Sequence, residues 1–449
     1  MRAPRGLLGL SPHHRTTSIL ENIADGDRRA ANLGGHTMLT PEPAPVIGID
    51  APRILVSTIA PVSGGVPTMT AFIVRTLREH GCEPILAHYQ PYSVSPTMSV
   101  PLIRLIGGRV GFQERVTLDG CATYAIGAWL PELEVTHYLA TRRWRSLIER
   151  AQAGIVVSGN ALGALPFYQT GRNFLAWLAS GWNADRQHRV REFSLARTLL
   201  DRTIVKPVAQ RMERAILNRG SILSLSHYTR RTLDAIVGRP VVRDVLPVPI
   251  DTEFFSPRPA ARVSGRIGFS GRLDDPRKNI ELLLETLALL RRQGHRVSAL
   301  LIGGERNAAI AARLADRGID GDVEFRPYGA HEALRAHLRT LDLFVVPSHQ
   351  EGLCIAALEA MACGIPVVST RCGGPEEFVI DGETGRVVGF DAAEMADAIV
   401  GILRDRTRRE RFAAAGRDLV LRHYTPQRAS DVFWAEFNRA FPDVASQTT

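Results

Sequence analysis

Two carboxylates placed eight positions apart are the residues best suited to chemistry in this chain of 449 residues. Glu351 precedes and Glu359 lies within a predicted helix over 353–363, which Gly364 ends. At 1.5 Å per residue the two acids stand roughly 12 Å apart, so each can hold one end of a ligand joined by a diphosphate. Between them, Gly352 allows close backbone approach, and the helix N-terminus offers N–H groups to phosphate.

A second group of residues, upstream, supplies positive charge. The chain has 55 lysines and arginines, but only Lys206 and Lys278 are lysines. Lys278 lies between a predicted strand (266–270) and a predicted helix (280–293). Its compact ammonium can reach phosphate oxygens in crowded surroundings, and Arg272 adds a planar fork, so together they can neutralise a diphosphate. Either glutamate, or Lys278, considered alone, is equally consistent with an ordinary surface residue.

The elements that must position these residues alternate between strands and helices. Buried strands are predicted at 342–346 and 365–370, and Gly373-Gly374-Pro375 is predicted to turn into a further helix with Glu376 and Glu377 in its first turn. Such alternation is typical of a parallel α/β sheet.

The first folded part of the chain shows the same alternation. A strand is predicted at 53–59, a helix at 68–80, and a strand at 84–89. The loop with Gly64 and Gly65 lets a ligand approach the backbone, or is a plain strand-to-helix turn. Because no GxGxxG motif follows the first strand, a nicotinamide site is not expected.

As a set, these segments resemble the donor half of retaining glycosyltransferases of family 4, which have the GT-B fold. The resemblance covers about 53–440 and is strongest beyond 245. The matching pieces are Gly271-Arg272, Lys278-Asn279, Pro347-Ser348, Glu351-Gly352, Glu359 to Met361 with Gly364, Gly373-Gly374, Asp381-Gly382 and the run Leu246 to Phe255. It implies an α/β protein with two Rossmann-like domains facing a central cleft, and a C-terminal helix that crosses back to the N-terminal domain.

The resemblance also implies an activity, the transfer of a sugar from a nucleotide-diphosphate sugar to an acceptor hydroxyl in glycan, glycolipid or polysaccharide biosynthesis. Arg272 and Lys278 would stabilise the departing diphosphate, Glu351 would contact the sugar, and Glu359 would hold the ribose. The other expected donor-binding residues are Gly64, Gly65, Gly271, Asn279, Gly352, Leu353, Gly373, Gly374 and Glu376. No Asp-x-Asp metal motif is apparent among the matching segments, so no metal and no cofactor are expected.

One departure from the family pattern leaves alternatives open. Many relatives have a donor-contacting histidine after a strand in the N-terminal domain, but the stretch 174–186 has none. Ser180, Trp182 or Asp185 would have to replace it. The alternatives are a GT-B nucleotide-sugar epimerase or phosphorylase, and a noncatalytic nucleotide-sugar-binding subunit.

Length and composition fit a two-domain enzyme. The expected divisions are a disordered tail (1–50), in which Met38 is an alternative start, an acceptor-binding domain (51–250), a linker (251–261), a donor-binding domain (262–425) and a C-terminal helix (426–449). Five cysteines without a CxxC pair predict neither disulfides nor a zinc site. Together with the lack of an apolar run of membrane-spanning length, this predicts a cytoplasmic location.

The segment 186–219 is the most basic part of the chain, with nine cations against three acids. The simplest interpretation is a solvated face, and the alternative is contact with the anionic inner face of a membrane. The expected acceptor is a glycan, a lipid-linked glycan or a small molecule. No nucleic-acid-binding motif accompanies the charge, and the oligomeric state is left open.

Overall fold

The computed structural model describes residues 51–60, 64–116, 120–186, 190, 194–257 and 263–447, which belong to one compact unit. The predicted tail (1–50), with Met38, and part of the predicted linker (258–261) lie outside these ranges.

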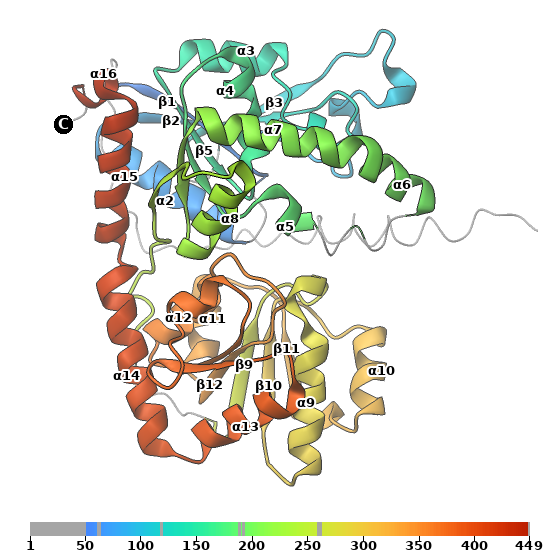
Figure 1. Cartoon of the computed structure of the whole chain (residues 1–449), viewed down its shortest axis with the longest axis vertical. Coiled ribbons are helices and arrows are strands. Elements are labelled where there is room, and N and C mark those ends of the chain that lie inside the picture. Colours follow the sequence, from blue (N-terminus) through green and yellow to red (C-terminus); the bar gives the residue numbers. More distant parts are fainter. Residues whose placement is uncertain are drawn as a thin grey trace, which may run out of the picture. The chain divides into compact units, whose positions relative to one another are not determined.

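The N-terminal lobe is built on a sheet of eight strands in the order β3-β4-β2-β1-β5-β6-β7-β8 (Figure 1). All neighbouring strands are parallel except β3 and β4, which pair antiparallel. The strands are β1 (Arg53–Thr58), β2 (Glu83–Tyr89), β3 (Phe112–Val116), β4 (Ala122–Ile126), β5 (Ala153–Ser158), β6 (Leu175–Leu178), β7 (Ser221–Ser224) and β8 (Val242–Val245).

Helices cover the two faces of this sheet, so its central strands are buried; all six residues of β5, for example, are buried. The helices are α2 (Gly65–Glu79), α3 (Arg142–Arg150), α4 (Leu165–Thr170), α5 (Trp182–Arg186), α6 (Leu195–Leu200), α7 (Lys206–Arg219) and α8 (His227–Val237), with a π-helical turn, η6 (Asp201–Val205), between α6 and α7. The predicted strands and helix at the start of this lobe are confirmed.

The C-terminal lobe is built on six parallel strands in the order β11-β10-β9-β12-β13-β14. They are β9 (Arg266–Ser270), β10 (Ser298–Ile302), β11 (Val323–Arg326), β12 (Leu343–Val346), β13 (Val367–Thr370) and β14 (Gly385–Val388). The helices are α9 (Ile280–Arg292), α10 (Ala308–Asp316), α11 (His331–Leu338), α12 (Ile355–Ala362), α13 (Ala392–Leu403) and α14 (Arg406–His423).

The last helices return the chain to the first sheet. α15 (Pro426–Ala440) contacts β6 and β8, and α16 (Pro442–Ala445) follows it (Figure 1). Buried Phe433 and Phe437 of α15 share one apolar cluster with residues of both sheets, such as Ile54 and Phe344. The crossing C-terminal helix is therefore confirmed, and so is the GT-B architecture of two Rossmann-like sheets.

Two predicted elements are wrong in detail. The predicted helix after Gly373-Gly374-Pro375 is a single 3-10 turn over Gly374–Glu377, because the chain reaches β14 after only a short loop. The sequence of 221–226 predicts the last strand and turn of the first domain, but the strand there, β7, is followed by one more, β8, at the edge of the sheet.

Candidate functional site

Lys278 and Glu351, predicted to act on one ligand, are in direct contact. Lys278 Nζ donates to Glu351 Oε1 at 2.7 Å, and the Ser348 hydroxyl donates to the same oxygen at 2.6 Å. The lysine and glutamate side chains are only 18% and 10% exposed. Burial acts to lower the pKa of Lys278, but the charge and hydrogen bond of Glu351 outweigh it, so this pKa is raised. The ammonium is therefore held charged, with further N–H groups for a ligand.

Lys278 is placed by a tight turn between β9 and α9. Asp275 begins a 3-10 turn over Pro276–Lys278 and accepts from the Arg277 backbone N–H at 3.0 Å. Asn279 then adopts the left-handed conformation, at φ 48°, as the residue preceding α9. A Cβ at Gly271 would lie 2.8 Å from the Phe269 ring and 3.4 Å from Lys278 Cε, so glycine is required where β9 ends.

Arg272 does not contact Lys278 in this structure. Its side chain is 57% exposed and donates to Asp275 at 2.6 Å. Burial acts to raise the pKa of Asp275, but Arg277 and Arg272 hold it well below its usual value. Burial raises the pKa of Tyr328, while the charges of Lys278 and Arg272 act to lower it, so both cations lie near this phenol.

Glu351 lies before α12 instead of opening it. Glu351 forms a β-bridge with Gly373. The Glu351 N–H donates to the Cys372 carbonyl at 2.8 Å, and the Glu351 carbonyl accepts from the Gly374 N–H at 3.0 Å. α12 begins only at Ile355, after Cys354 at φ 72°. The predicted helix over 353–363 therefore starts late, and the separation of the two glutamates cannot be taken from helical rise.

Glu359 is buried on α12, 8% exposed, and burial raises its pKa to about 8. Among the described residues, no contact joins its carboxylate to the Lys278–Glu351 pair. The structure thus brings together two of the four charged residues predicted to surround one diphosphate.

Several predicted glycines are packed against protein atoms. A Cβ at Gly352 would lie 2.6 Å from the Ala179 carbonyl oxygen, and one at Gly373 would lie 2.7 Å from the Tyr228 ring. A Cβ at Gly374 would lie 2.2 Å from the Gly352 carbonyl oxygen. Gly352 and Gly373 are therefore required where the two lobes pack together, and Gly374 is required by packing within the C-terminal lobe, whereas the sequence analysis expected all three to bind the donor.

The other predicted residues lie on the same loops. A Cβ at Gly65 would lie 3.2 Å from Ile355 Cδ1, so the Gly64-Gly65 loop lies against the start of α12. Leu353 is buried, 3% exposed, and precedes that helix. The Glu376 carboxylate accepts from the Gly373 N–H at 2.9 Å, within its own turn.

A residue that sequence reasoning did not single out, Glu377, joins the two lobes. Its carboxylate accepts from the backbone N–H groups of His227 at 3.0 Å and Tyr228 at 2.5 Å, in the first turn of α8. A carboxylate there satisfies free N–H groups and meets the positive end of the helix dipole. Ser226 adds a second contact between lobes, donating to the Gly352 carbonyl at 2.7 Å.

The residues considered as substitutes for the absent histidine are engaged elsewhere. The Ser180 hydroxyl donates to the Gly159 carbonyl at 2.9 Å. Trp182 is fully buried, and its ring lies 4.3 Å from the Arg186 guanidinium. The side chain of Asp185 lies outside the described residues.

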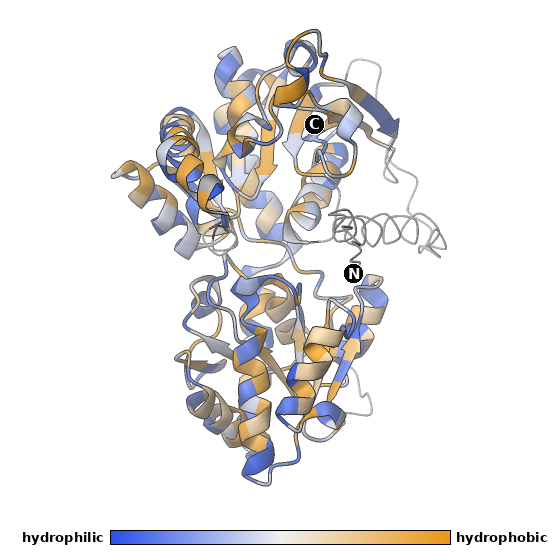
Figure 2. Cartoon of the chain, turned by 90° about the vertical axis from the view of Figure 1, so that its right-hand side faces the viewer, coloured by the Kyte–Doolittle hydropathy of each residue, from blue (hydrophilic) through white to orange (hydrophobic). Residues whose placement is uncertain are grey.

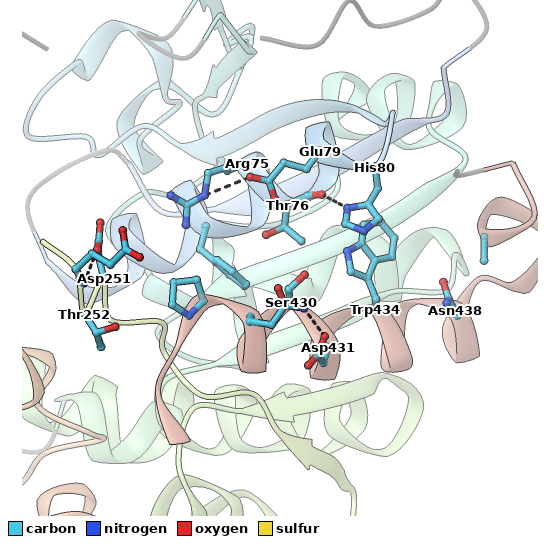
Figure 3. Close-up of a pocket in the computed structure, with 15 residues that line it drawn as sticks. Arg75, Thr76, Glu79, His80, Asp251, Thr252, Ser430, Asp431, Trp434 and Asn438 are labelled. Carbon is cyan, nitrogen blue, oxygen red and sulfur yellow. Dashed lines mark hydrogen bonds and ion pairs between the residues drawn. The ribbon is translucent and has the colours of Figure 1, made fainter. Parts of the chain in front are cut away.

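A cavity of about 880 Å³ lies apart from these residues. It is lined by α2, by the connector at 251–253 and by α15, with His80 and Trp434 in ring contact at 4.2 Å (Figure 3). None of the predicted donor-binding residues lines it, so the candidate site is defined by the Lys278–Glu351 pair.

Residues 264–405 match the family model described as Glycosyl transferases group 1. A GDP-mannose-dependent alpha-(1-6)-phosphatidylinositol monomannoside mannosyltransferase from Mycolicibacterium smegmatis is 35% identical over 234 residues, covering 48% of this chain and 61% of the relative. A D-inositol 3-phosphate glycosyltransferase from Frankia alni is 38% identical over 191 residues, covering 38% of this chain and 47% of the relative. The chain thus spans about half to three fifths of the length of these relatives.

Solved structures share the fold at low sequence identity. Sucrose-phosphate synthase from Thermosynechococcus elongatus superposes with a TM-score of 0.66 at 19% identity, covering 88% of this chain and all (100%) of that one. HepE from Anabaena, in complex with UDP, superposes with a TM-score of 0.63 at 16% identity, covering 86% of this chain and 100% of that one. The chain therefore has the GT-B fold and carries a glycosyl transferases group 1 domain that includes Lys278, Glu351 and Glu359.

Proposed function

We propose that this chain is a retaining glycosyltransferase that moves a hexose from a nucleotide-diphosphate sugar to an acceptor hydroxyl. The observation that carries the proposal is the buried Lys278–Glu351 pair beside the start of α12, inside the matched domain. The bond between the sugar C1 and the phosphate oxygen breaks while the acceptor oxygen bonds to C1 from the same face. The acceptor proton passes to the departing phosphate oxygen, and no metal or other cofactor is required.

Each charged residue has a part in this reaction. Lys278 donates one hydrogen bond to Glu351 and directs its other N–H groups at the diphosphate, with Arg272 as a second cation. Among the described residues, both hydrogen bonds to the Glu351 carboxylate fall on Oε1, so Oε2 can accept from a sugar hydroxyl. Glu359 accepts hydrogen bonds from the ribose hydroxyls.

The relatives indicate which substrates to try first. Because the first relatives are GDP-mannose-dependent and act on a phosphatidylinositol mannoside, GDP-mannose and a lipid-linked acceptor come first. UDP-sugars come next, because HepE was solved with UDP. We extend the proposal to a cytoplasmic enzyme in peripheral contact with the inner face of a membrane. No helix among the described residues is long and apolar enough to span a bilayer.

Incubation with labelled GDP-mannose or UDP-glucose and phosphatidylinositol or inositol phosphate acceptors tests the proposal. We expect a glycosylated product whose anomeric configuration matches the donor. A donor isomerised at the sugar indicates an epimerase, and a free sugar phosphate indicates a phosphorylase. Because Ser180 and Trp182 are engaged elsewhere, a noncatalytic subunit is the remaining alternative, and calorimetric donor binding without transfer to any acceptor would establish it.

A further inference from the structure

Two exposed segments of the N-terminal lobe carry large apolar side chains. In the first, Ile103 is 89% and Ile106 101% exposed, and in the second, Leu195 is 91% and Leu199 65% exposed. We call these segments together the apolar face. Its members are Leu102, Ile103, Leu105, Ile106, Leu195, Leu199, Leu200 and Ile204.

A short chain of contacts joins the two segments. The Leu102 N–H donates to Glu132 Oε1 at 3.1 Å, and two residues further on Glu134 accepts from Arg186 Nε at 3.1 Å. Arg186 also pairs with Asp201 of η6 at 2.8 Å. Both segments therefore attach to the same stretch of backbone, and both project from the right-hand side of the N-terminal lobe in Figure 1. Seen from that side, Figure 2 shows hydrophobic residues along the projecting α6.

Among the described residues, exposed arginines flank both segments of the apolar face, together with one exposed acid, Glu132. Arg104, Arg109, Arg197 and Arg202 are exposed, whereas Asp201 is buried against Arg186. Arg186 itself is only 5% exposed, so it does not contribute to the basic surface expected from the segment 186–219. Among the described residues, two arginines of the segment 186–219, Arg197 and Arg202, thus lie among its exposed aliphatic side chains.

We propose that the apolar face docks on a bilayer that contains anionic lipids. Aliphatic side chains that project into water gain from burial among acyl chains, and flanking arginines gain from anionic headgroups. Protein interfaces are enriched in aromatic side chains, whereas the members of the apolar face are all aliphatic. The inference rests on the proposed function, because an enzyme that glycosylates a lipid-linked acceptor must work at the membrane surface.

Binding to vesicles tests the docking without any substrate. The whole chain is mixed with phosphatidylcholine vesicles, with or without phosphatidylglycerol, and sedimented. We expect the chain to bind the anionic vesicles, and added salt to weaken this binding. We expect about tenfold or more weaker binding from two double variants, Leu195→Asp/Leu199→Asp and Ile103→Asp/Ile106→Asp. Each variant loses two aliphatic side chains that docking would bury in the bilayer.

Matched substitutions separate this effect from a general one. Leu421→Asp and Arg406→Glu change exposed residues of α14 and should leave vesicle binding unchanged, whereas Arg104→Glu/Arg202→Glu should weaken it on anionic vesicles. Wild-type protein that stays in the supernatant, or variants that bind as wild type, would overturn the proposal. So would a wild-type dimer that the leucine variants dissociate, because a second copy would then cover the face. Since no turnover is measured, failure here leaves the proposed transferase activity standing.

Discussion

Replacement of Glu359 by glutamine tests the assignment of this buried carboxyl. Burial raises the pKa of Glu359 to about 8 in the folded protein, whereas an unfolded chain releases the proton near its ordinary value. The folded state therefore binds more protons between these two values. The contribution of Glu359 to the free energy of unfolding is therefore fully present below the pKa that this group has in the unfolded chain. It is lost as pH rises through about 8, the pKa in the folded protein.

The magnitude follows from the size of the shift. An increase from 4.5 to about 8 in the folded state, at 1.36 kcal/mol per unit, corresponds to a loss of about 4 to 5 kcal/mol across this window. Glutamine has nearly the same shape and no charge, so Glu359→Gln should not lose stability there. In urea unfolding, the free energy of unfolding of the variant should exceed that of the wild type by a margin that grows by several kcal/mol from about pH 5 to about pH 9.

The same carboxyl should couple donor binding to protons. Ribose hydroxyls that donate to Glu359 favour its carboxylate, so nucleotide binding at neutral pH should release a proton that Glu359→Gln does not release. Calorimetry in two buffers of different ionisation enthalpy measures this release. Glu285→Gln, which changes an exposed acid of α9 that is not assigned to the site, is the control and should follow the wild type. Stability differences that stay constant with pH would refute the assigned pKa, and proton release unchanged in Glu359→Gln would refute the ribose contact.

Three further outcomes are expected. Lys278→Ala should reduce kcat about 100-fold or more with the fold intact, because the leaving diphosphate loses its buried cation. The control variant Lys206→Ala should retain activity. Normal turnover of Lys278→Ala would remove this residue from the site. Glu377→Ala should speed hydrogen exchange at the backbone amides of His227 and Tyr228, because these amides lose their hydrogen-bond acceptor. Replacement of Glu376 by alanine should leave this exchange unchanged. Equal protection in both variants would show that the contact between lobes is not formed. Treatment with a chelator should leave turnover unchanged, and activity restored only by a divalent cation would contradict metal-independent transfer.

The C-terminal lobe was predictable from the sequence because its strands are short, apolar and buried on both faces. β9 lies at the residues predicted, and α9 ends one residue earlier than predicted. In contrast, β8 was missed, since exposed Arg243 and Asp244 break its apolar run at the edge of the sheet. The antiparallel β3 was missed for a similar reason, because it is short and mostly exposed.

The candidate site was predictable as a set of residues but not as a geometry. The two glutamates were assigned to opposite ends of one helix because periodicity cannot show where a helix begins after an irregular loop. Cys354, at φ 72°, marks the true boundary, and a non-glycine residue in that conformation leaves no signal in the sequence. That Lys278 and Glu351 lie close together was expected from their chemistry, because a rare lysine and a loop acid in one domain both suit a diphosphate sugar, but their direct contact was not predicted.

Glu376 and Glu377 show most directly what a single sequence lacks. Both are acids in the same short turn, and local chemistry gives no reason to prefer either. They differ because the N–H groups of His227 and Tyr228, about 150 residues earlier in the chain, lie beside Glu377. Gly373 is a similar case. A glycine indicates that there is little room for a side chain, but only the tertiary structure shows that the Tyr228 ring occupies the place where its Cβ would lie. Residues that join the lobes can therefore be identified only from the tertiary structure, whereas the residues proposed to bind a charged ligand are indicated by their own chemistry.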